Sequence, residues 1–471
     1  MHLGGDMLNK KKILLAVIFV ISISFLYSGE SLSVSSAEKI TTICKGVFID
    51  AVDVSGMTGA EAETAVDNYI KELRGKGIAI LVGENVVYRT MGELGYTFEA
   101  NDYLEQAIGL CRSGNLVKRY KDKKDIEQGN IVYPLTYTFD ENILKDLITK
   151  EVSTYNVSPV NATLIRDKGK FIYKDHMIGS KVDINQTFEL VKNQIIKWNR
   201  RDIIAEAVMV EDLPVYNLED AMKCDTILGE FTTEYKDSSD NRAANLANGA
   251  KFINNTVLYP GEVFSSYECL EPFSLENGYF IGGAYLDGEV IESIGGGSCQ
   301  VTTTLYNAVL YSELEIVERQ AHSMTVSYVT LSRDAAISEG SKDFRFSNNT
   351  DAPILVQAFT NNRKITFRIW GHETRDTVNR RIEYESVKLT EITPSADVIT
   401  LDPNQPTSYK KVTQKAHIGY KAELYKIIYK NDVEVSRSLF NRSTYNAEPN
   451  HITIGTKILD INEKPEIVEI P

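Results

Sequence analysis

The sequence lacks any basic stripe of the kind that nucleic-acid-binding proteins carry, and its net charge is −14. It also lacks a Cys-x-x-Cys pair, so the cysteines do not have the spacing of a zinc site. The five cysteines occur singly along the chain, at Cys44, Cys111, Cys224, Cys269 and Cys299. We therefore expect no nucleic-acid partner, no metal and no cofactor.

The apolar run at the N-terminus, Ile13 to Tyr27, is shorter than the roughly 20 residues that a membrane-spanning helix needs. Three lysines precede it and small residues at 35–37 offer a cleavage site, as in an export signal. We predict that residues 1–29 are a signal peptide or an N-terminal membrane anchor, and that the serine-rich residues 30–44 are a linker. Either alternative places the remaining chain outside the cytoplasm, secreted or held at the cell membrane through the N-terminus.

Residues 45–213 contain an internal duplication, in which a helix, a strand pair, a glycine and a second helix follow one another twice. The corresponding helix starts at Thr58 and Asp140 are 82 positions apart, and those at Asn101 and Asn185 are 84 positions apart. Two nearly equal offsets indicate a repeated unit. The pattern predicts a duplicated α+β N-terminal module with repeats at 45–130 and 131–213.

Local signals within this duplication predict individual elements. Thr58 and Glu61 have the spacing of a capping box at the start of a helix. The charged stretch from Arg112 to Gln128, between the two units, is predicted to be a solvated loop. No residues here have catalytic spacing, which suits a binding, spacer or structural role.

The stretch Gly295-Gly296-Gly297-Ser298-Cys299 is the strongest candidate for chemistry. Successive glycines allow close approach of a ligand, and the apolar residues after Cys299 have helical spacing. A cysteine at a helix N-terminus has a lowered thiol pKa, and the nearby N–H groups can hold an oxyanion. An odd cysteine count in an exported chain also leaves at least one thiol unpaired. The alternative is a tight turn followed by a buried structural cysteine, and any pairing of the other cysteines stays open.

The C-terminal residues 373–471 are strand-rich and carry no residues with catalytic spacing. Alternating segments occur at 384–389, 422–429 and 433–439, with a turn at Asn431-Asp432 between the last two. The predicted fold class is α+β multidomain: a duplicated α+β module, a mixed α+β domain and a small all-β C-terminal domain.

Residues 228–372 resemble the VanW family. The resemblance rests on segments in consistent order, including Asn241 to Asn245, Tyr259 to Ser265, Ile294 to Leu310, Glu315 to Arg319, His322-Ser323 and Asp343 to Asn348. The duplicated region resembles the peptidoglycan-binding module that often precedes VanW domains. The C-terminal strands are similar to glycine-rich wall-associated β modules, although the signature glycines are sparse here.

The resemblance implies an activity, because some VanW members look like cysteine L,D-transpeptidases of the cell wall. Cys299 would then be the nucleophile, with Gly296, Gly297 and Ser298 forming the oxyanion loop. The substrates would be peptidoglycan tetrapeptide stems, joined by diaminopimelate-diaminopimelate cross-links with release of D-alanine. A non-catalytic wall-binding protein and a cysteine carboxypeptidase or peptidase acting on the same stems are the alternatives.

His322 is the candidate base, because it is the sole histidine of the matched core and its ordinary pKa is near neutrality. The family often has His-x-His-Ser at this place, whereas this chain has Gln320-Ala321-His322-Ser323. Asp334 or Asp343 could orient His322, although a strand-end or turn role is open for each. Arg345 could bind a substrate carboxylate or pair with a neighbouring carboxylate.

Overall fold

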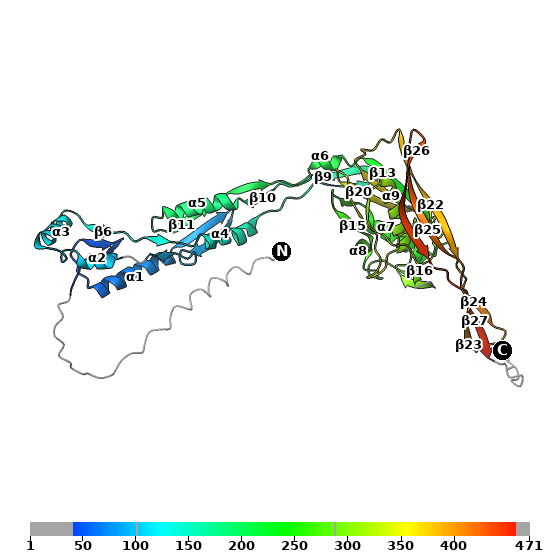
Figure 1. The fold of residues 1–471 in the computed structure, drawn as a ribbon, viewed down its shortest axis with the longest axis horizontal. Helices are drawn as coiled ribbons and strands as arrows, with labels where there is room; N and C mark the ends of the chain where they lie inside the picture. Colours follow the sequence, from blue (N-terminus) through cyan, green and yellow to red (C-terminus); the bar gives the residue numbers. More distant parts are fainter. Residues whose placement is uncertain (1–40, 100–101, 287–288, 458–471) are drawn as a thin grey trace, which may run out of the picture. The chain divides into compact units, whose positions relative to one another are not determined.

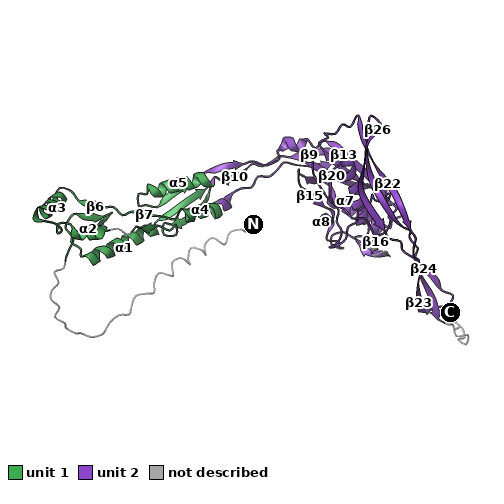
Figure 2. Ribbon diagram, in the orientation of Figure 1, with its two compact units in different colours: residues 1–152, 184–207 green, residues 153–183, 208–471 purple. Residues whose placement is uncertain are grey.

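The computed structural model describes residues 41–99, 102–286 and 289–457. The predicted signal or anchor over 1–29 and most of the linker lie outside these residues. Within the described ranges, no helix combines the length and the apolar character needed to cross a membrane. The chain divides into unit 1, residues 1–152 and 184–207, and unit 2, residues 153–183 and 208–471 (Figure 2).

Unit 1 consists of helices and small sheets. Its helix α1 (Gly59–Gly75) begins at Thr58, whose side chain forms the predicted capping box with Glu61. The two three-stranded sheets have the orders β2-β1-β6 and β11-β3-β4. The other elements are β1 (Val47–Ile49), β2 (Val52–Asp53), β3 (Gly77–Val82), β4 (Asn85–Thr90), β5 (Thr97–Phe98), α2 (Tyr103–Gly109), β6 (Ile131–Tyr133), β7 (Tyr137–Thr138), α4 (Glu141–Lys150), α5 (Ile184–Ile196) and β11 (Ile203–Glu206).

The two predicted repeats share their sheets. Strand β1 pairs in parallel with β6, and β3 pairs in parallel with β11, so each pairing joins the first repeat to the second. Residues 153–183 of the second repeat belong to unit 2, where β10 (Gly179–Val182) pairs with β12 (Met209–Asp212). The hairpin of β8 (Thr163–Asp167) and β9 (Lys170–Lys174) also lies there. The extent of each unit is therefore determined by pairing between strands far apart in the sequence, which sequence periodicity cannot predict.

The charged stretch at 112–128 is a helix, α3 (Leu116–Gln128), and the prediction of a loop was wrong. Asn115 caps α3 by accepting a hydrogen bond from the Lys118 N–H. Lys118 also pairs with Asp122 one turn later at 3.0 Å, and no residue of the helix is buried. The large apolar side chains at its start, Leu116, Val117 and Tyr120, are exposed, and the rest of α3 is mostly charged, so it has no apolar stripe from which the sequence could predict it.

The core of unit 2 is an antiparallel sheet with the order β13-β21-β20-β14. Its strands are β13 (Thr226–Glu234), β14 (Thr256–Leu258), β20 (Ile354–Asn361) and β21 (Lys364–Gly371). Successive residues of a strand point to opposite faces. Ile354 and Val356 therefore belong to the core that contains the helices α7 (Asp240–Ile253) and α9 (Ser298–Ser312), whereas Leu355 packs with Trp370 and Leu164 of the β8–β9 hairpin.

Unit 2 has further elements besides this sheet and its two helices, of which α9 is buried along nearly its whole length. One sheet has the order β15-β19-β18, and β16 pairs with β17 in a hairpin. These elements are η1 (Val152–Tyr155, at the junction of the two units), α6 (Leu218–Met222), β15 (Val263–Ser265), α8 (Ser266–Leu270), β16 (Ile281–Leu286), β17 (Glu289–Ile294), β18 (Glu315–Glu318) and β19 (Arg345–Ser347).

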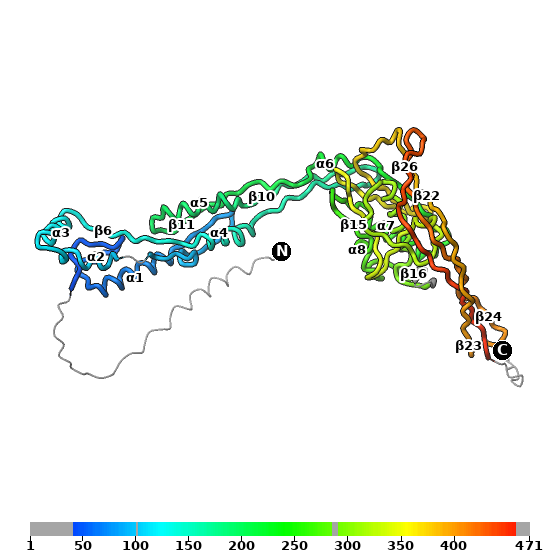
Figure 3. Tube along the Cα trace, in the orientation of Figure 1, coloured from blue at the N-terminus to red at the C-terminus, as the bar shows by residue number. Residues whose placement is uncertain are grey.

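The C-terminal part is all β, as predicted. Strands β22 (Arg380–Ile392), β25 (Gly419–Lys430) and β26 (Val433–Tyr445) run side by side (Figures 1 and 3). The turn between β25 and β26 falls at Asn431 and Asp432, both at positive φ, as the sequence indicated. The last sheet contains β23 (Val398–Pro406), β24 (Lys410–Gln414) and β27 (His451–Lys457). The predicted α+β multidomain class is confirmed.

Candidate active site

The glycine loop joins the β16–β17 hairpin to α9. Gly295 and Gly297 have φ angles of 80° and 113°, which other residues rarely adopt. A Cβ on Gly296 would lie 2.3 Å from the Gly282 carbonyl oxygen, so the two chain segments touch through backbone. Asn245 holds this arrangement by donating to the Gly296 carbonyl at 2.9 Å. The loop therefore requires glycine for conformation and for close packing.

Cys299 is the second residue of α9 and is half-buried. Its thiol donates to the Ile337 carbonyl at 3.5 Å. Burial raises the pKa of this thiol, but His322, a backbone hydrogen bond from Ile337 to the thiolate, and Lys342 outweigh burial, so the pKa lies below the ordinary cysteine value. The predicted position at a helix N-terminus is confirmed, and the environment favours a thiolate.

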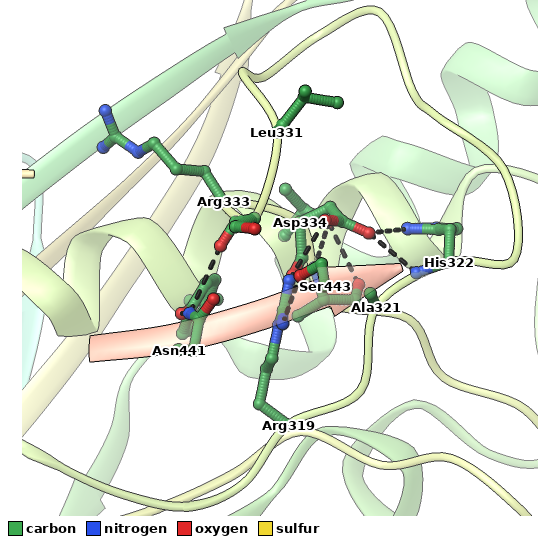
Figure 4. Close-up of polar contacts among 12 residues, drawn as sticks. Arg319, Ala321, His322, Leu331, Arg333, Asp334, Asn441 and Ser443 are labelled. Carbon is green, nitrogen blue, oxygen red and sulfur yellow. Dashed lines mark hydrogen bonds and ion pairs between the residues drawn. The ribbon is translucent and has the colours of Figure 1, made fainter. Parts of the chain in front are cut away.

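His322 is bonded to Asp334. Its ring Nδ1 lies 2.7 Å from Asp334 Oδ2, and its backbone N–H donates to the same oxygen at 2.7 Å (Figure 4). The two side chains are 5% and 1% exposed. Burial lowers the pKa of His322, but Asp334 and the Cys299 thiol raise it to about 9. The carboxylate thus fixes the ring and favours the imidazolium.

The opposite ring atom, His322 Nε2, is buried and has no partner at hydrogen-bond geometry within the described residues. His322 and Cys299 nevertheless line the same cleft, and each shifts the pKa of the other. Contacts between catalytic groups are often long in an enzyme without substrate. The Asp334 carboxylate therefore holds the His322 imidazole in one orientation, and this imidazole lines the same cleft as the Cys299 thiol.

The second oxygen of Asp334 has its own donors. Arg319 Nη2 and the Tyr445 hydroxyl donate to Oδ1 at 3.1 and 2.5 Å. Arg319 Nε also donates to the Asp334 backbone carbonyl at 2.7 Å. Burial raises the pKa of Asp334, but His322, Arg319 and Tyr445 lower it to about 2. Asp334 is therefore ionised at neutral pH, although it is nearly inaccessible to water.

A polar face of α9 holds the loop around Asp334. Thr303 donates to the Ala335 carbonyl and accepts from the Ala335 N–H, both at 3.0 Å. Asn307 donates to the Arg333 carbonyl at 2.8 Å. Sequence reasoning missed Thr303 and Asn307, although two buried polar residues one turn apart on an apolar helix are a signal that could have identified them.

Cys299 and His322 line a cleft of about 730 Å³. Gly296, Gly297 and Ser298 also line it. Further lining residues include Arg242, Tyr267, Phe273, Tyr328 and Glu339. Among the described residues, no group of three or more His, Cys, Asp or Glu side chains is arranged to hold a metal.

Three other predicted residues have structural surroundings. The Ser298 hydroxyl donates to the Gly295 carbonyl at 2.8 Å. Asp343 accepts from the Ser265 hydroxyl and the Tyr267 N–H, and its carboxylate is engaged there instead of at His322. Arg345 belongs to β19, and its Nε is buried without a hydrogen-bond partner in the described chain. The structure thus joins Asp334, and not Asp343, to the histidine.

Three family descriptions match consecutive parts of the chain. Residues 88–203 match "Putative peptidoglycan binding domain", residues 241–370 match "VanW like protein" and residues 384–457 match "G5 domain". The peptidoglycan-binding and G5 matches indicate a protein associated with the cell wall. A solved structure titled "IgA1 Protease G5 domain structure" is 26% identical, covering 18% of this chain and 99% of that one, with a TM-score of 0.13.

Two curated proteins are similar to the chain. The "Uncharacterized protein YoaR" of Bacillus subtilis (strain 168) is 40% identical over 131 residues, which are 28% of this chain and 43% of that protein. The "Vancomycin B-type resistance protein VanW" of Enterococcus faecalis (strain ATCC 700802 / V583) is 28% identical over 137 residues, 28% of this chain and 50% of that protein. The chain therefore spans half or less of the length of these relatives. These matches show that the chain contains a VanW-like domain, which lies between a peptidoglycan-binding domain and a G5 domain in the sequence.

Proposed function

We propose that the VanW-like domain is a cysteine-dependent L,D-transpeptidase that acts on peptidoglycan tetrapeptide stems. The observation that carries the proposal is the arrangement of Asp334, His322 and Cys299, in which Asp334 holds the imidazole, and the imidazole and the thiol line the same cleft. A structural cysteine needs neither a lowered thiol pKa nor a histidine held by a buried carboxylate. The matched peptidoglycan-binding and G5 domains support a substrate in the wall.

In the first step the Cys299 thiolate attacks the diaminopimelate carbonyl that precedes the terminal D-alanine. A carbon–sulfur bond forms and the carbonyl oxygen becomes an oxyanion. When the carbon–nitrogen bond breaks, protonated His322 gives its proton to the leaving amine of D-alanine. The product is a thioester on Cys299 with neutral His322.

In the second step the side-chain amine of a diaminopimelate on a neighbouring stem attacks the thioester. His322 takes the proton from this amine, the thiolate leaves, and the new amide joins the two stems. The Ser298 N–H already donates to Gly295 and the Gln300 N–H to Gly297. We therefore assign the Cys299 N–H, in the first turn of α9, as a donor to the oxyanion.

In this proposal the outer parts of the chain bring the domain to its substrate. Residues 1–29 export the chain or anchor it in the membrane, and the region matched at 88–203 binds the glycan or its stems. The domain boundaries at 45–130, 131–213, 228–372 and 373–471 are proposed on the same basis. Analysis of culture fractions for the intact chain tests whether the N-terminus is retained at the membrane.

The test is mass spectrometry of disaccharide-tetrapeptides incubated with the full chain, wild type beside Cys299→Ala. We expect a cross-linked dimer that has lost one D-alanine, formed by the wild type alone. Cys44→Ala is the matched control, since Cys44 is a half-buried thiol in unit 1, and it should retain activity. Tripeptide monomers without dimers would indicate hydrolysis by the same residues. Unchanged substrate with folded wild type would favour a wall-binding protein.

A further inference from the structure

The strand β26 belongs to the segment matched to the G5 domain, whereas Asp334 belongs to the segment matched to the VanW family. Residues Asn441, Ser443 and Tyr445 alternate with exposed Arg442 and Thr444 along this strand. They therefore point to one face of it. All three reach the residues around Asp334, so this face of β26 is part of the wall behind the candidate site.

Tyr445 makes the closest of these contacts. Its hydroxyl donates to Asp334 Oδ1 at 2.5 Å and accepts from the Ser332 N–H at 2.6 Å. One buried phenol thus binds the carboxylate and the backbone two residues earlier, and its side chain is 1% exposed. With Oδ1 occupied in this way, Oδ2 is the oxygen that faces His322.

Ser443 acts on the same carboxylate through Arg319. Arg319 Nη1 donates to the Ser443 hydroxyl at 2.9 Å, while its Nη2 and Nε donate to Asp334. Figure 4 shows the Arg319 guanidinium bonded to both Asp334 and Ser443, which lie next to each other. The Arg319 side chain is 6% exposed, so a lost partner would leave a buried charge with one fewer acceptor.

A second set of contacts fixes the same sheet to the other end of α9. Glu313 follows the last turn of α9 and pairs with Arg380 at 2.5 Å and with Lys426 at 2.6 Å. The Tyr384 hydroxyl donates to the Leu310 carbonyl at 2.9 Å. Because the sheet is held at two places, β26 has a defined position relative to Asp334.

We propose that Tyr445 and Ser443 are positioning residues of the Cys299–His322–Asp334 site, so that a strand of the G5-matched segment completes a site in the VanW-matched segment. This inference rests on the proposed function for its effect on turnover. The G5-matched segment then has a role in the reaction in addition to any contact with the wall. Neither residue touches the reacting atoms, since both act through Asp334 or Arg319.

Tyr445→Phe in the full chain tests the inference, because it removes the hydroxyl and keeps the ring. We expect the rate of dimer formation to fall by about ten-fold to a hundred-fold, the effect of losing one hydrogen bond to a charged group. We also expect the pH midpoint for alkylation of Cys299 by iodoacetamide to shift, because Asp334 loses a hydrogen bond that fixes its orientation toward His322 and reduces its basicity. A tyrosine that only supported packing would not move this midpoint.

Tyr425→Phe is the matched control, since its hydroxyl donates to Glu423 in the same sheet and does not contact Asp334. It should leave both the rate and the alkylation midpoint unchanged. Ser443→Ala removes one hydroxyl and should change both in the same direction as Tyr445→Phe, by less. If Tyr445→Phe does not fold, Ser443→Ala alone tests the inference.

Folded Tyr445→Phe or Ser443→Ala proteins with wild-type rates and midpoints would overturn the inference, while the proposed function would stand. A wild-type protein that forms no dimer and alkylates Cys299 with an ordinary cysteine midpoint would instead remove the proposed function itself. The two failures are therefore distinguishable by the same pair of measurements.

Discussion

Asp334 and Asp343 lie nine positions apart, and their surroundings differ completely. The Asp334 carboxylate meets an imidazole, a guanidinium and a phenol. Asp343 accepts from the Ser265 hydroxyl and from two backbone N–H groups. Asp334 can therefore orient the His322 ring and stabilise its protonated form. Asp343, by contrast, holds the turn before α8 together. The comparison shows that a carboxylate's role follows from the donors that the fold brings to it.

The largest expected effect comes from Asp334→Asn, which keeps the shape of the side chain and removes its charge. The rate of dimer formation should fall by about 10³- to 10⁴-fold, as when the orienting carboxylate of a Ser-His-Asp triad is replaced. The matched variant Asp343→Asn should retain activity within about ten-fold, because it leaves His322 and its partner intact. Initial rates from muropeptide analysis measure both. Equal losses would contradict the difference in role.

The variant Asp343→Ala tests whether Asp343 contributes to the stability of the fold. It leaves the Ser265 hydroxyl and the Tyr267 and Phe344 N–H groups without their acceptor. The free energy of unfolding should fall by about 1–3 kcal/mol, which thermal or denaturant unfolding measures. Glu276→Ala, which changes an exposed loop carboxylate, should have little effect. A stable Asp343→Ala protein would indicate that the turn does not depend on this residue.

The pH dependence of Cys299 alkylation gives the smallest effect. The thiol pKa is below its ordinary value, so the reactive thiolate is present above that lowered pKa and is lost as the pH falls through it. Asp334→Asn should raise the midpoint by about one pH unit, because the imidazolium beside the thiolate loses its carboxylate partner. Asp343→Asn should leave the midpoint unchanged. If the wild type, Asp334→Asn and Asp343→Asn had the same midpoint, Asp334 would have no influence on the pKa of the Cys299 thiol.

Elements with strong local signals could be predicted from the sequence. The capping box at Thr58 and the start of α9 at the glycine loop are where the residue pattern placed them. The turn at Asn431-Asp432 was predictable because these residue types tolerate positive φ. The helix α3 was missed, because its stability comes from a cap and from charge pairs that leave no periodic apolar face.

By itself, the sequence determined that a cysteine follows three glycines at a helix start, that one histidine lies within reach along the chain, and that a strand-rich segment comes last. Only the tertiary structure decided which aspartate meets His322 and that Tyr445 reaches Asp334 across 111 positions. Local patterns report dihedral preferences and burial over a few residues. The partners of a buried carboxylate come from segments far apart in the chain, and packing alone brings them together.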